Sequence, residues 1–138
     1  MKNLIPAVLM ILMSMPVLAQ AAPGKSKSVE CRSPNMGYQV SIRGQLKLKP
    51  VQSGAFAASG KLAVQMGSVR GRPNPVQNVL FRGQYDKVKG FEYATLGAEN
   101  SGEIDMLYIN FGDTKDRTDS YIEMRSGARQ PLDCSQSN

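Results

Sequence analysis

The residues that could carry out nucleophilic or acid–base chemistry are few in this chain. It contains no histidine and only two cysteines, Cys31 and Cys134. A Cys–His nucleophile or a zinc site of the usual ligands therefore cannot be assembled. Carboxylates remain as general bases, but no spacing in the sequence pairs two of them as in a glycosidase. We expect no enzyme and no cofactor, and we keep an unrecognised carboxylate-based enzyme only as a third hypothesis.

Three aspartates recur at intervals of three in one polar segment, at Asp113, Asp116 and Asp119. Clustered carboxylates are the ligands that calcium favours, so a loop could fold these three around one ion. The spacing differs from the alternate positions of an EF-hand, and basic residues stand between the acids. We therefore favour a solvated hairpin loop without a metal, with calcium as the alternative.

Arginines offer a better binding candidate. Arg70 and Arg72 lie in the glycine- and proline-rich stretch 67–75, and Arg82, Lys87 and Lys89 follow it. A guanidinium group recognises phosphate or carboxylate through its planar fork of donors. We predict that these five residues bind an anionic partner, and we expect 67–75 to be a loop.

Charge is divided unevenly along the chain. Residues 25–89 hold 12 Lys or Arg against 2 Asp or Glu, whereas residues 90–138 hold 4 against 9. A basic half suggests a polysaccharide, lipid head groups or nucleic acid as partner. Nucleic acid is the least expected, because such readers add exposed aromatics and Phe81 and Tyr85 have core positions. The alternative, which the scattered basic residues favour, is that opposite charges meet on neighbouring strands.

The amino-terminal residues have the pattern of a secretion signal. Lys2 precedes the apolar run 4–18, and Ala19-Gln20-Ala21 fits the small-x-small cleavage rule. We expect residues 1–21 to be cleaved, residues 22–27 to form a disordered tail and residues 28–135 to form one domain, with no transmembrane span after cleavage. The protein would then be periplasmic or secreted.

Export determines how the two cysteines are interpreted. In an oxidising compartment an even number of cysteines indicates a disulfide, and two cysteines allow one intramolecular pairing. A Cys31–Cys134 bond would close a loop of about 100 residues, which the chain-entropy model values at up to ~4.7 kcal/mol.

Alternation of apolar and polar residues predicts the elements that carry these groups. From Tyr38 to Lys49 the apolar residues share one parity, and Gly44 interrupts them on the apolar face, where we expect a bulge or a sharp bend. A second alternating run at 56–66 completes a hairpin. Residues 104–111 are apolar on both parities, which indicates a deeply buried strand or one whose second face meets a partner. Other strands are expected at 28–32, 79–86, 91–95, 121–124 and 132–134.

About eight strands and no helix are predicted, with turn signals about every ten residues. This pattern indicates an all-β fold in meander order, either a small antiparallel barrel or a sandwich. In a closed barrel the first and last strands are neighbours, so the disulfide would join them.

In outline the chain resembles the periplasmic inhibitors of C-type lysozyme, which are exported, all-β and have one cysteine near each end. That family carries a Ser-Gly-x-x-Tyr motif, whereas here Ser126-Gly127-Ala128-Arg129 is followed by Gln130. The resemblance implies an inhibitor of a hydrolase such as lysozyme, which is our second hypothesis. Our first is an exported, non-catalytic β domain that binds an anionic envelope component or a protein partner.

Overall fold

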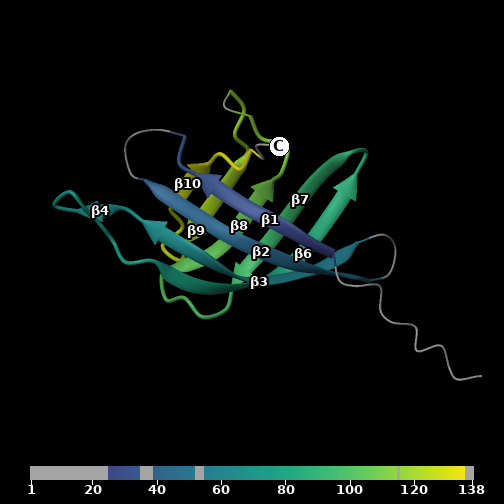
Figure 1. Ribbon diagram of the computed structural model, residues 1–138, viewed down its shortest axis with the longest axis horizontal. Helices are drawn as coiled ribbons and strands as arrows, with labels where there is room; N and C mark the ends of the chain where they lie inside the picture. Colours follow the sequence, from purple (N-terminus) through teal and green to yellow (C-terminus); the bar gives the residue numbers. More distant parts are fainter. Residues whose placement is uncertain (1–24, 35–38, 52–54, 115, 136–138) are drawn as a thin grey trace, which may run out of the picture.

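Eight antiparallel strands form one curled sheet, a half-barrel, in the computed structural model (Figure 1). The structure describes residues 25–34, 39–51, 55–114 and 116–135. The expected signal peptide lies outside these residues. The all-β prediction is confirmed, and no helix occurs in the described ranges.

The order of the strands in the sheet is their order in the chain, so the predicted meander is confirmed. The strands are β1 (Lys25–Arg32), β2 (Val40–Pro50), β3 (Phe56–Met66), β6 (Gln77–Val88), β7 (Phe91–Ala98), β8 (Ile104–Asn110), β9 (Ser120–Met124) and β10 (Arg129–Leu132). A separate two-stranded ladder consists of β4 (Ser68–Val69) and β5 (Arg72–Pro73).

Two boundaries differ from the prediction. β1 begins at Lys25, within the segment expected to be a polar tail, because Lys25 to Ser28 pair with Leu48 to Gln45 of β2. The stretch 67–75, expected to be a loop, contains the β4–β5 hairpin. In its turn Arg70 and Gly71 both have left-handed backbone conformations, with φ of 52° and 74°. Glycine adopts this conformation without cost.

On each strand the apolar side chains at alternate positions point to the inside of the curled sheet and form the core. Ile42, Leu46, Leu62, Phe81 and Leu107 are all fully buried. On β2, β3 and β6 the residues of the opposite parity are exposed or half-buried, as alternation requires. On β8, which is apolar on both parities, the outward Met106 and Tyr108 are half-buried.

Glycines on the inner face allow close approach between strands. Gly44 has φ 151° and keeps its register with Val29 and Leu62, so the expected bulge is not there. The register shift lies instead between Ile104 and Met106. A Cβ at Gly83 would lie 1.9 Å from the carbonyl oxygen of Thr95, so only glycine fits at that position.

The first strand meets the segment that follows the last strand. Arg32 and Asp133 exchange two backbone hydrogen bonds of 2.8 and 2.7 Å. Next to them, Cys31 and Cys134 form a disulfide with a Cα–Cα distance of 4.1 Å, as predicted. This seam joins one end of β1 to the end of the described chain.

In the part of the chain that the structure describes, no helix has the length and apolarity needed to cross a bilayer.

Candidate anion-binding face

Strand alternation places four basic side chains on the outer surface of β2 and β3. Arg43, Lys47 and Lys49 have the outward parity of β2 and are exposed. Lys61 lies on β3 between Ser59 and Ala63, which are the partners of Lys47 and Arg43. We call Arg43, Lys47, Lys49 and Lys61 the basic face. At a rise of about 3.3 Å per residue, it extends for roughly 20 Å along β2.

None of the four cations of the basic face forms an ion pair within the described residues. On β3 their neighbours are small and neutral: Ala63 opposite Arg43, Ser59 opposite Lys47 and Ala57 opposite Lys49. On β1, Ser26 stands opposite Lys47, and the acidic Glu30 stands opposite Arg43. The ion pairs of the described residues involve Lys27, Arg32, Arg82, Lys87 and Arg129 instead. The three lysines therefore carry positive charge without an acidic neighbour, whereas Arg43 faces Glu30 across the β1–β2 ladder.

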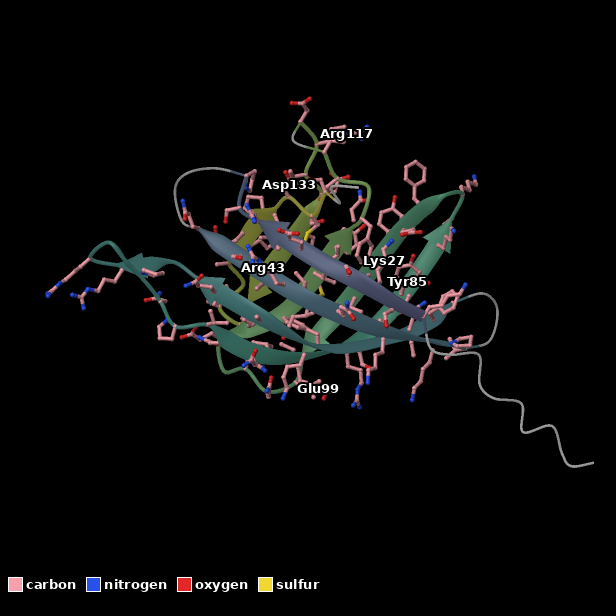
Figure 2. The ribbon with its side chains drawn as sticks, in the orientation of Figure 1. Lys27, Arg43, Tyr85, Glu99, Arg117 and Asp133 are labelled. Atoms are coloured by element: carbon pink, nitrogen blue, oxygen red, sulfur yellow. A yellow bond between two sulfur atoms is a disulfide. The ribbon has the colours of Figure 1, made fainter. Side chains whose placement is uncertain are left out.

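A groove of about 640 Å³ adjoins the basic face at Arg43. Arg32 and Arg43 line it together with the polar side chains of Gln39, Ser41 and Gln65. Arg32 also contacts the exposed Glu30 at 3.1 Å. Because this pair is exposed to solvent, it contributes little to stability. Glu30 is also the β1 neighbour of Arg43, so one carboxylate of the protein lies at this end of the basic face. The label of Arg43 in Figure 2 marks this region of the sheet.

The β4–β5 hairpin forms one border of the groove through Gly71 and Pro73. It projects from the sheet in Figure 1. Two side-chain hydrogen bonds hold its base: the Gln65 amide donates to the carbonyl of Asn74 at 2.8 Å, and the Asn74 amide donates to that of Met66 at 2.6 Å. The hairpin presents Arg70 and Arg72, both exposed, beside the groove.

The other three basic residues predicted to bind lie elsewhere. Arg82 is on the outer face of β6 and pairs with Glu99 at 3.3 Å. Lys87 pairs with Glu92 at 3.9 Å, and Lys89 occupies the β6–β7 turn at φ 51°. At about 3.3 Å per residue the two ends of β6 are roughly 30 Å apart. The structure therefore separates Lys87 and Lys89 from Arg70 and Arg72.

The expectation that opposite charges meet on neighbouring strands holds for part of the chain. Arg82–Glu99 and Lys87–Glu92 join adjacent strands of the basic and acidic halves. Lys27–Glu92 joins the two halves across the inner face. The basic face is the exception, and none of its four residues was among the five predicted binding residues. Its signal was the shared parity of Arg43, Lys47 and Lys49.

The aspartates of the predicted calcium alternative do not converge. Asp113 is buried, and its carboxylate accepts hydrogen bonds from the Asp119 backbone at 3.0 Å and from the Ser120 backbone and hydroxyl at 3.1 and 2.6 Å. Asp116 is exposed to solvent. No group of three metal-ligating side chains occurs among the described residues. Asp113 stabilises the loop between β8 and β9.

A polar cluster on the inner face joins Lys27, Tyr85 and Glu92. The Lys27 ammonium lies 2.5 Å from the Glu92 carboxylate and 4.9 Å from the ring centre of Phe111. The hydrogen bond from Lys27 lowers the pKa of Glu92. Burial, together with the hydrogen bond to Glu92, raises the pKa of Tyr85 to about 12. Near neutral pH, Glu92 is therefore ionised and Tyr85 is protonated.

Aromatic side chains form a row on the outer surface of β7, β8 and β9. Ring centres lie 6.3 Å apart for Phe91 and Tyr93, 6.1 Å for Tyr93 and Tyr108, and 5.4 Å for Tyr108 and Tyr121. The Arg129 guanidinium lies 4.5 Å from the centre of the Tyr121 ring. Because the tyrosine rings stack on one another, their faces are largely occupied within the molecule. The row stabilises the sheet through cross-strand pairs.

Comparison with known protein families, with characterised proteins and with solved structures finds no match to this chain. The segment that carried the resemblance to lysozyme inhibitors lies in the β9–β10 turn. There Gly127 has φ 89° and its amide donates to the carbonyl of Met124 at 2.9 Å.

Proposed function

We propose that this protein is an exported, non-catalytic β domain that binds an anionic polymer of the cell envelope along its basic face. The observation that carries the proposal is the set of four exposed cations on two adjacent strands, none of which forms an ion pair within the described residues. A surface of one sign attracts polymers of the opposite sign and increases their rate of association. The disulfide supports export, since such bonds persist in oxidising compartments.

Linear polymers suit this surface better than small anions. The basic face is elongated along β2, and its neutral neighbours are short side chains, so an extended chain can contact several cations at once. Arg32 and Arg43 in the groove, with Arg70 and Arg72 on the adjoining hairpin, extend the positive surface at one end. Exposed charges are screened by salt, so binding should weaken as ionic strength rises.

Heparin affinity chromatography tests the proposal. The variant K47S/K49S removes two charges from the basic face, and we expect it to elute at a lower salt concentration than the unmodified protein. The matched control K89N/R117S removes two exposed charges from turns outside the face, and we expect elution close to that of the unmodified protein. Asparagine at position 89 tolerates the left-handed conformation found there.

Equal elution of K47S/K49S and K89N/R117S would overturn the proposal, because retention would then depend on net charge alone. A third variant, R70A/R72A, tests the hairpin separately. Full retention of that variant, with loss in K47S/K49S, would place binding on the strands rather than on the hairpin.

A further inference from the structure

We infer that the anionic polymer is an acidic polysaccharide, whose uronate carboxylates contact Arg43, Lys47 and Lys49 and whose hydroxyl groups contact the groove. This inference rests on the proposed function and specifies the ligand of the same site. Arg43 belongs to the basic face and also lines the groove, and its guanidinium group can bind a carboxylate through paired hydrogen bonds.

Neutral polar side chains in the groove favour a sugar over a phosphate polymer. Gln39, Ser41 and Gln65 line the groove between its two arginines and the hairpin. Amide and hydroxyl groups both donate and accept hydrogen bonds, as the hydroxyl groups of a sugar require. Polyphosphate has only acceptors along its length, so cations alone would suffice for it.

Neutral groups also lie among the cations of the basic face, although Lys47 and Lys49 occupy successive outward positions of β2. Gln45 stands between Arg43 and Lys47 on the outer parity of β2, which separates these two cations by about 13 Å. Ser26 and Ser59 flank Lys47 on the neighbouring strands. Such spacing fits a polymer whose charges are separated by hydroxylated units.

Nucleic acid fits this surface poorly. Proteins that bind single strands combine a basic groove with aromatic side chains on which bases stack. The outward residues of β1, β2 and β3 in the described chain include no aromatic side chain. The outward aromatics lie on β7, β8 and β9 instead, where Tyr93, Tyr108 and Tyr121 stack on one another and Phe91 is tilted against Tyr93.

Titration of the full chain with three polymers of matched charge tests the inference: oligogalacturonate, polyphosphate and single-stranded DNA. At equal salt we expect the unmodified protein to bind oligogalacturonate most tightly. The variant S41A/Q45A keeps every charge but removes two neutral hydrogen-bonding groups. We expect it to weaken oligogalacturonate binding about tenfold and polyphosphate binding less than about twofold. Both positions face outward, and a melting curve confirms folding.

The possible outcomes separate the inference from the proposed function. If S41A/Q45A affects oligogalacturonate and polyphosphate equally, or if polyphosphate binds more tightly to the unmodified protein, the polysaccharide inference is wrong. The proposed function still stands in that case, provided that R43S weakens binding of both polymers. If the unmodified protein binds none of the three, both proposals fail.

Discussion

Lys27 and Glu92 connect β1 to β7 across the inner face of the sheet, with the ammonium 2.5 Å from the carboxylate although the two residues are 65 positions apart in the chain. Lys27 and Tyr85 are labelled beside each other in Figure 2. With the disulfide at Cys31, this ion pair gives β1 a second attachment besides its ladder with β2. The two attachments lie at opposite ends of the strand.

Replacing Glu92 by Gln should make the protein less stable near neutral pH and less sensitive to acid. The pKa of Glu92 is lowered from its ordinary value of 4.5, mainly by the hydrogen bond from Lys27. Its contribution to stability is therefore complete above that value and is lost as pH falls through the lower folded-state pKa. We expect E92Q to cost about 1–3 kcal/mol near neutral pH, because Lys27 loses its charged acceptor.

Urea denaturation across the acid range measures this effect. The free energies of unfolding of E92Q and of the unmodified protein should converge as pH falls below the folded-state pKa of Glu92. A constant difference between the two at every pH would contradict the assignment.

Tyr85 should ionise well above the ordinary pKa of a tyrosine. Its pKa is raised from 10.0 to about 12 by burial and by its hydrogen bond to Glu92. A raised pKa means that the contribution of Tyr85 to stability is full below pH 10.0 and is lost as pH rises towards about 12. Ultraviolet absorbance of tyrosinate during an alkaline titration should show a step near pH 12, and that step should be missing in Y85F. If Y85F keeps that step, another tyrosine produces it.

Removing the disulfide should lower stability without changing the sheet. The bond joins residues 103 positions apart, so it restricts a long loop in the unfolded chain. We expect C31S/C134S to lose about 2–4 kcal/mol of unfolding free energy, measured by denaturant titration. Adding reductant should destabilise the unmodified protein by a similar amount and leave the variant unchanged. An unmodified protein indifferent to reductant would contradict this role.

Gly83 and Gly102 form a matched pair for testing strand packing. A Cβ at Gly83 would meet the backbone of Thr95 at 1.9 Å and that of Leu96 at 2.9 Å, whereas a Cβ at Gly102 would meet nothing within 4 Å. We expect G83A to lower the melting temperature strongly, with a cost of about 1–3 kcal/mol or more, because backbone must move. G102A should change stability by less than about 0.5 kcal/mol. Equal effects of the two substitutions would show that the strands do not approach closely at Gly83.

Alternation predicted the strands because each strand of a curled sheet buries one parity, and this rule needs no knowledge of the partner strand. The outward position of Lys47 and Lys49 follows from the same rule. The rule does not predict that these two lysines lack acidic partners, because that depends on which strand lies beside each cation. The five predicted binding residues were grouped by closeness in sequence, but the length of β6 separates Lys87 and Lys89 from the hairpin.

Contacts across the curl could not be predicted for a related reason. Glu92 and Lys27 both have inward parity, but their meeting depends on how tightly the sheet curls. The stack of Tyr93, Tyr108 and Tyr121 depends on the register of three strands. Asp113 was grouped with its neighbours as a metal ligand because the sequence does not show that its carboxylate is buried against Ser120.

The meander order has a consequence for the kinetics of folding. Apart from the contact at the seam, each ladder of the large sheet joins two strands that follow one another in the chain. The pair β3 and β6 is separated only by the small β4–β5 hairpin. Short loops close at low entropic cost, so these ladders can form early and in sequence. The contact of Arg32 with Asp133 spans most of the described chain and has the largest closure cost. We therefore expect the seam to form last, so that the disulfide fixes a sheet that has already assembled.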